Sequence, residues 1–155
     1  MKKLTASTKY LAKITSSNVY DVVVPTPLFL APILSKNFKN KILLKREDLQ
    51  PVFSFKIRGA YNKLSKLKKK GGLKRVVAAS AGNHAQGVAF SAKKLLLKAT
   101  IVMPITTPSI KVNSVKNLGS KVVLYGDNFD EAYSYALKLT KEPGVIFVHP
   151  YDDPD

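Results

Sequence analysis

The sequence predicts an α/β protein in which helices cover the faces of a mostly parallel sheet. Between residues 75 and 148, four short apolar runs alternate with three stretches of helical spacing, an order typical of βαβ units. Glycine or proline stands at the junctions, as at Gly82, Pro104 and Gly119. We expect these units to form a compact region over residues 48–148.

The amino-terminal third is less regular. Residues 8–14 have the spacing of a short helix, and two prolines fix residues 22–28 in an extended conformation. We expect a helical turn at residues 30–36 and an apolar strand at residues 41–45. Pro51 ends any helix before the next segment.

The compact region begins with an amphipathic helix over residues 56–70, which the Gly71-Gly72 pair ends. Its apolar positions are Ile57, Ala60, Tyr61, Leu64 and Leu67. Strands are expected at residues 75–79, 99–103, 121–125 and 145–148, and further helices at residues 83–96, 109–118 and 128–141.

Two of these helices begin at residues that can act as caps. Ser109 is a candidate cap for the helix over residues 109–118, and either Asn128 or Asp130 for the helix over residues 128–141. The residues expected on or near the inner side of the first of these helices are Ile110, Val112 and Val115.

Composition sets the outer limits. A chain of 155 residues with 45% hydrophobic content fits one globular domain. The absence of cysteine excludes disulfides and thiolate metal sites, and the spacing of His84 and His149 argues against any metal site. No apolar run approaches the roughly 20 residues of a membrane-spanning helix, and the first five residues do not resemble a signal peptide. We expect a cytoplasmic protein that does not bind membranes.

The charge is unusually positive, with a net charge of +16 and a pI near 10. Residues 49–126 contain fifteen lysines and arginines and no acidic residue. However, arginine is scarce, no nucleic-acid-binding motif is present, and only residues 68–70 form a tight basic run. We therefore expect no specific nucleic-acid partner, and keep a basic module that binds polyanions non-specifically as an alternative.

The segment SFKIRGA at residues 54–60 contains the first candidate for chemistry, Lys56. A lysine that carries an aldehyde must have its amine desolvated and deprotonated. Phe55 and Ile57 give it apolar neighbours, and Gly59 adds little bulk. The alternative is that Lys56 is one of 23 lysines, most of them solvent-exposed.

The segment SAGNHAQG at residues 80–87 is the second candidate. A strand that enters a helix through a small-residue turn presents free backbone N–H groups at a partly positive helix terminus, which binds anions such as a carboxylate. The alternative is a tight turn in which Ser80 and Asn83 only cap the helix.

Both segments resemble those of threonine dehydratases (threonine deaminases), which are pyridoxal-phosphate enzymes of the tryptophan-synthase-β type. The similarity covers KREDLQPVFSFKIRGAY at residues 45–61, ASAGNHAQGVA at residues 79–89 and NFDEA at residues 128–132. It extends from about residue 20 to residue 150. The KRED start and the QPV before Ser54 are similar to the biosynthetic branch of the family.

The resemblance implies the small α/β lobe of a fold-type II pyridoxal-phosphate enzyme. It implies that Lys56 is catalytic and bonds to the cofactor, with Phe55 and Asn83 also at the cofactor and Asn83 at its phenolic oxygen. The residues it assigns to the substrate carboxylate are Ser80, Ala81, Gly82, Asn83 and His84.

The implied reaction converts L-threonine to 2-oxobutanoate and ammonia, the first step of isoleucine biosynthesis. In it, the Lys56 amine removes the α-proton while the cofactor ring accepts electrons, and the β-hydroxyl then leaves. L-Serine is an alternative substrate, because contacts to the γ-methyl group cannot be identified in the sequence.

The family's chain continues past this point to a glycine-rich phosphate loop, a serine near the pyridine nitrogen and most of a larger lobe. The resemblance therefore divides this chain into residues 1–47, which belong to the larger lobe, residues 48–148, the small lobe, and residues 149–155, a truncated return. We expect a truncated chain, with an inactive relic or fragment as the alternative. The family's tetramer is doubtful for such a chain, and residues 1–44 should leave apolar surface uncovered.

Overall fold

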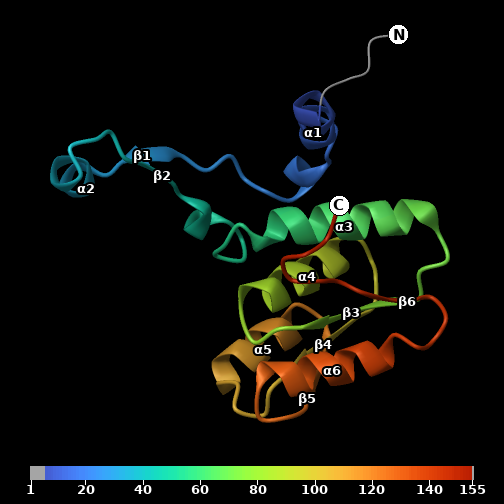
Figure 1. The fold of residues 1–155 in the computed structure, drawn as a ribbon. Coiled ribbons are helices and arrows are strands. Elements are labelled where there is room, and N and C mark those ends of the chain that lie inside the picture. Colours follow the sequence, from blue (N-terminus) through green and yellow to red (C-terminus); the bar gives the residue numbers. More distant parts are fainter. Residues whose placement is uncertain (1–5, 155) are drawn as a thin grey trace, which may run out of the picture.

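A computed structural model describes residues 6–154, and its centre is a four-stranded parallel sheet in the order β5-β4-β3-β6 (Figure 1). The strands are β3 (Arg75–Ala79), β4 (Ala99–Met103), β5 (Lys121–Leu124) and β6 (Val145–Phe147). The predicted α/β class and parallel sheet are confirmed.

The strand order reverses once. The chain steps from β3 to β4 to β5 and then returns to the other side of β3 as β6. Right-handed crossovers made in opposite directions place their helices on opposite faces of a sheet. Accordingly, α4 (Asn83–Lys94) and α5 (Ser109–Asn117) pack on one face and α6 (Phe129–Leu139) on the other, with α3 (Lys56–Lys70) beside α4 (Figure 1). The carboxyl ends of β3 and β6 lie next to each other where the order reverses.

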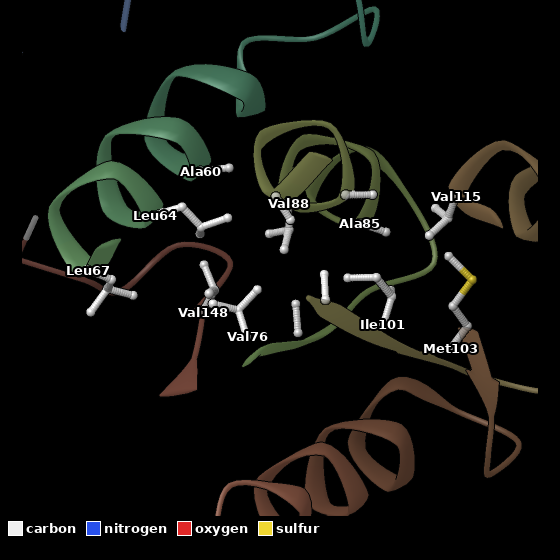
Figure 2. Close-up of a cluster of buried hydrophobic side chains, with 14 of the residues drawn as sticks. Ala60, Leu64, Leu67, Val76, Ala85, Val88, Ile101, Met103, Val115 and Val148 are labelled. Carbon is white, nitrogen blue, oxygen red and sulfur yellow. The ribbon is translucent and has the colours of Figure 1, made fainter. Parts of the chain in front are cut away.

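Both faces of the sheet are buried, and alternate residues of each strand serve alternate faces. Val76 and Ile101 point toward α3 and α4, where they meet Leu64 and Val88 (Figure 2). Val77, like Val102 and Ala79, faces α6. This two-sided burial explains why the strands are nearly continuous apolar runs in the sequence.

The predicted elements of the compact region all form, with ends within two residues of the predicted positions. α3, β3 and β4 have the predicted bounds. Asn128 caps α6, since its side chain accepts a hydrogen bond from the backbone N–H of Glu131 at 3.0 Å. Asp130 is therefore not the cap.

Two predictions for α5 are wrong. Pro108 occupies the cap position, and Ser109 is the first helical residue and makes no capping hydrogen bond. Ile110 is 74% exposed, whereas Val112 and Val115 are buried. Two residues along a helix turn its surface by about 200°, so Ile110 faces away from Val112.

The amino-terminal elements include a hairpin that projects from the sheet (Figure 1). They are α1 (Ala6–Thr15), β1 (Leu28–Leu30), α2 (Pro32–Asn37) and β2 (Leu43–Lys45), with single 3-10 turns at Val19–Asp21 and Glu47–Leu49. β1 and β2 pair antiparallel. The helical turn begins at Pro32 rather than at Leu30, which lies in β1, because proline is favoured at the first position of a helix.

We call residues 28–45 the arm. All six of its strand residues are exposed, and so are most of its other large apolar side chains. The exposed apolar side chains of the arm are Leu28, Phe29, Leu30, Ile33, Leu34, Phe38, Leu43 and Leu44. This agrees with the uncovered apolar surface expected of residues 1–44. No helix within residues 6–154 has the length and apolarity required to cross a bilayer.

Two isoleucines test the burial pattern with the same chemical change. Ile101 is fully buried in β4, and Ile110 is exposed on α5. We expect Ile101→Ala to lower the free energy of unfolding by about 2–4 kcal/mol, because it removes buried methylene groups and leaves a cavity. Ile110→Ala should change it by less than about 0.5 kcal/mol. Urea unfolding of both variants measures the difference, and equal losses would contradict the assignment of the inner face of α5.

Candidate active site

A cavity of about 390 Å³ opens where the carboxyl ends of β3 and β6 meet the first turns of α3. In parallel α/β sheets, ligands bind outside the carboxyl ends of the strands at the point where the strand order reverses. The position therefore marks a candidate ligand site on fold geometry alone. Its lining residues include Phe55, Lys56, Lys63, His84, Val148, His149, Pro150 and Tyr151.

Lys56 is the first residue of α3. It lines the cavity together with the segment that follows β6. The side chain is half-buried, and its Nζ donates a hydrogen bond of 2.5 Å to the carbonyl oxygen of Pro150. The exposed ring of Phe55 lies 5.5 Å from the same nitrogen. The amine is thus held by one carbonyl and one aromatic face, and both contacts can be replaced by a ligand.

Gly87 determines how closely α4 approaches Lys56. A Cβ atom at Gly87 would lie 3.0 Å from the carbonyl oxygen of Lys56 and 3.1 Å from its carbonyl carbon. A Cβ there would be tighter than an ordinary contact and would press on the backbone, so glycine allows the two helix backbones to lie in close contact. This contact sets the first turn of α3 against the amino-terminal half of α4.

His84, in the first turn of α4, is buried and keeps its ring neutral. Its pKa is lowered from 6.5 to about 4, mainly by burial and to a smaller extent by the nearby charges of Lys56 and His149, while the hydrogen bond to Val148 opposes the shift. The Nε2 atom lies 2.9 Å from the carbonyl oxygen of Val148. A carbonyl only accepts, so the neutral ring must have its proton on Nε2. His84 therefore ties α4 to the segment that follows β6.

The turn between β3 and α4 leaves the helix start open. Gly82 is the cap residue and no side chain caps the helix. The hydroxyl of Ser80 instead accepts a hydrogen bond from the N–H of Gly82 at 3.2 Å, and Asn83 is exposed. The capping alternative for Ser80 and Asn83 is therefore wrong. The first backbone N–H groups of α4 remain available to an anion.

The structure brings together only part of the predicted site. Phe55, Lys56 and His84 line one cavity. The other four predicted residues are outside the lining, where Ser80, Ala81 and Gly82 form the turn before α4 and Asn83 begins the helix. Sequence analysis missed the residues after β6, among them His149, Pro150 and Tyr151. The carboxyl ends of parallel strands share one edge of the sheet, so the position of this segment directly after the last predicted strand was the signal for them.

The segment after β6, residues 148–153, forms the second wall of the cavity, and its own hydrogen bonds and ion pair hold it in place. The N–H of Val148 donates to Val77 in β3 at 2.8 Å, and the carboxylate of Asp153 pairs with Lys63 of α3 at 3.0 Å. The Nδ1 atom of His149 accepts from the N–H of Asp152 at 2.9 Å. Across residues 6–154, no three His, Asp or Glu side chains gather as a metal site requires.

Comparison with known proteins decides the family. Residues 19–155 match the family described as "Pyridoxal-phosphate dependent enzyme". The chain belongs to this family. The cofactor class and the enzyme class predicted from the two sequence segments are thereby confirmed.

Curated relatives named threonine dehydratase align with nearly the whole of this chain. The chain is 58% identical over 147 residues to "Threonine dehydratase 1 biosynthetic, chloroplastic" of Solanum lycopersicum, covering 95% of this chain and 24% of that protein. It is 51% identical over 152 residues to "L-threonine dehydratase biosynthetic IlvA" of Burkholderia multivorans, covering 96% of this chain and 30% of that protein. The predicted resemblance to biosynthetic threonine dehydratases is confirmed.

A solved structure gives the same result for the fold. The processed form of threonine deaminase isoform 2 from Solanum lycopersicum superposes with a TM-score of 0.87 at 51% identity, covering 94% of this chain and 40% of that chain. The fold-type II class is confirmed. The chain thus spans about a quarter of the length of the first curated relative and less than half of this structure. The proposed boundaries at residues 47 and 148 stay a prediction.

The residues of the cavity fit pyridoxal phosphate. Its aldehyde requires a primary amine, which Lys56 places at the cavity mouth, and its flat ring requires an apolar face, which the exposed Phe55 offers. The hydroxyl of Ser54, two residues before Lys56, is buried without a hydrogen-bond partner. An unsatisfied buried hydroxyl costs free energy and is often explained by a functional role.

Two glycines of adjacent helices test the close contact at Lys56. We expect Gly87→Ala to lower the free energy of unfolding by about 1–3 kcal/mol, because its Cβ would press on the backbone of Lys56. Gly59→Ala, at an exposed helical position with nothing within 4 Å, should raise it by about 0.5–1 kcal/mol through helix propensity alone. Urea unfolding measures both. A stabilising Gly87→Ala would show that α3 and α4 are not held in contact here.

The neutral His84 makes stability depend on pH. Its pKa is about 4 in the folded chain, against an ordinary value of 6.5. As pH falls below 6.5 the unfolded chain takes up a proton that the folded chain refuses, so stability is lost between pH 6.5 and 4, by about 3 kcal/mol at the limit. In His84→Gln this loss should disappear. Unfolding free energies measured from pH 7 to 5 test it, and parallel curves for the two proteins would refute the burial of a neutral ring.

Proposed function

We propose that this chain carries the lysine side of an L-threonine ammonia-lyase, which forms 2-oxobutanoate and ammonia in the first step of isoleucine biosynthesis. The observation that carries the proposal is that Lys56 lines the cavity together with His84 from the uncapped first turn of α4. The biosynthetic names of the relatives support the pathway.

Lys56 has two tasks in this proposal. Its Nζ must give up the hydrogen bond to Pro150 before it can bond to the cofactor. Once freed, the same nitrogen is the base that accepts the α-proton of the amino acid. Pyridoxal phosphate, when bound, supplies the electron sink for that proton removal. Because α3 begins at Lys56, the nitrogen swings on a side chain whose backbone is fixed by the contact with Gly87.

The start of α4 is the proposed carboxylate site. Its uncapped N–H groups and partly positive terminus favour an anion. Because the His84 ring is neutral, the backbone N–H groups rather than this side chain attract the anion. His84 instead holds the segment after β6 through its hydrogen bond to Val148. Asn83, the exposed first residue of α4, would supply an amide to the phenolic oxygen of the cofactor. Phe55 would shield one face of the ring from water.

The proposal concerns the part that this chain supplies. The relatives are three to four times longer than the matched segment, and their remaining length is the proposed source of the phosphate and ring-nitrogen contacts. Residues 1–155 assayed by themselves are therefore proposed to bond pyridoxal phosphate at Lys56 and to turn over L-threonine only slowly.

Lys56→Ala tests the proposal directly. In the unsubstituted chain, borohydride should trap a pyridoxal phosphate adduct at Lys56, and 2-oxoacid release from L-threonine should be measurable but slow. Lys56→Ala should abolish both, because the reacting amine is gone. Mass spectrometry of the trapped peptide and a 2-oxoacid assay provide the two measurements.

Lys111→Ala serves as the matched control, since Lys111 is exposed on α5, away from the cavity. It should leave both the adduct and any turnover unchanged. An adduct of equal yield in Lys56→Ala would mean that other lysines react non-specifically, and the proposed role of Lys56 would then fail.

A further inference from the structure

We propose that Glu47 is a positioning residue for Lys56 and acts through Arg58, the third residue of α3. The inference rests on the proposed role of Lys56 as the reacting amine. It adds a specific anchor outside the cavity, on the 3-10 turn at Glu47–Leu49, whose connection to the site is not visible from sequence spacing.

The carboxylate of Glu47 holds Arg58 with both oxygens. Arg58 donates from Nε to Oε2 at 2.7 Å and from Nη2 to Oε1 at 2.9 Å. Such a bidentate ion pair fixes the orientation of the two side chains as well as their distance, because the guanidinium and the carboxylate are both planar. The side chains are only 27% and 15% exposed, so water screens this pair less than it screens an exposed one.

Glu47 also accepts hydrogen bonds from one residue on each side of the arm, Thr26 before it and Gln50 after it. Thr26 donates its hydroxyl to Oε1 at 2.7 Å, and the Gln50 amide lies 3.4 Å from both oxygens. Gln50 in turn is 1% exposed and exchanges two hydrogen bonds with the backbone of Val24, at 3.0 and 2.9 Å. These donors, with Arg58 the largest contributor, lower the pKa of Glu47 to about 2. The carboxylate therefore stays charged at any pH in which the protein works.

The anchor reaches the reacting amine through one helical turn. Arg58 lies two residues after Lys56, and both line the cavity. Lys56 makes no capping contact of its own, since no side chain caps the start of α3. Three contacts hold this first turn: the backbone contact with Gly87, the packing of the buried Ile57 against Val23 and Val52, and the pair between Arg58 and Glu47. Of the three, the pair is the one that fixes the direction of Arg58, so its loss weakens the hold on the turn without unpacking it.

A neighbouring ion pair provides a matched control. Arg46 and Asp48 flank Glu47 and form a bidentate ion pair of their own. Arg46 donates from Nε to Oδ1 at 2.8 Å and from Nη2 to Oδ2 at 2.6 Å. That pair is exposed, at 37% and 55%, and joins two residues of the same turn without touching α3. Removing its charge therefore tests the loss of an ion pair in this segment without the loss of the anchor.

The experiment compares Glu47→Gln with Asp48→Asn in two measurements. The first is the acylation rate of Lys56 relative to the exposed Lys111, using trace acetic anhydride and mass spectrometry, which needs no cofactor. The second is the pyridoxal phosphate concentration that gives half-maximal borohydride-trapped adduct at Lys56. Circular dichroism ensures that each variant is folded under the conditions used.

We expect Glu47→Gln to raise the relative acylation rate of Lys56 and the half-maximal cofactor concentration, each by about tenfold, the scale of one lost charge-assisted hydrogen bond. Asp48→Asn should change neither. Glu47→Asp should restore part of both values, because it keeps the charge at a shorter reach. Arg58→Lys keeps the positive charge but not the bidentate geometry, so it should give the same changes as Glu47→Gln. If Glu47→Gln does not fold, Arg58→Lys takes its place in both measurements.

The results separate this inference from the proposed function. If the unsubstituted chain gives no adduct at Lys56 while acylation still responds to Glu47→Gln, the anchor stands and the proposed function fails. If Glu47→Gln and Arg58→Lys both match Asp48→Asn in the two measurements, Glu47 does not position Lys56 and the inference is overturned.

Discussion

The contact between the backbones of α3 and α4 at Gly87 is the constraint on which the site depends. It places Lys56, which begins α3, against the amino-terminal half of α4, and His84 in the first turn of α4 then links this helix to the segment after β6. Three segments that are far apart in the sequence therefore meet at the carboxyl ends of the parallel strands. A larger residue at Gly87 would separate the lysine from both of its neighbours at once.

Sequence analysis located the compact region well because its signals are local. Strands buried on both faces are continuous apolar runs, and Gly71 ends α3 with a positive φ of 76°, as a glycine after a helix is expected to do. The errors arose where a neighbour decides the outcome. Ser109 lies one residue inside its helix because Pro108 occupies the cap position, and Ile110 turns outward.

The site itself was predictable only as two segments. The sequence offers Lys56 and the turn before α4, but no periodicity relates them to Pro150 or to Glu47. Those contacts depend on the reversal of strand order and on a partly buried ion pair, which only three-dimensional structure defines. The acid-free stretch of residues 49–126 contributes Lys56, Arg58 and Lys63 to the cavity lining, and of these Arg58 and Lys63 pair with Glu47 and Asp153.

Because the segment after β6 forms part of the cavity, the cavity can form only late in synthesis of the chain. Lys56 and its partner Pro150 are 94 residues apart in the chain. At a synthesis rate of roughly 5–20 residues per second, the lysine precedes its carbonyl partner by about 5–20 seconds. During that interval β6 has not been made, so the nascent chain has the amine but no cavity to enclose it. Any selectivity that the cavity confers on Lys56 therefore begins only when the last strand joins the sheet beside β3.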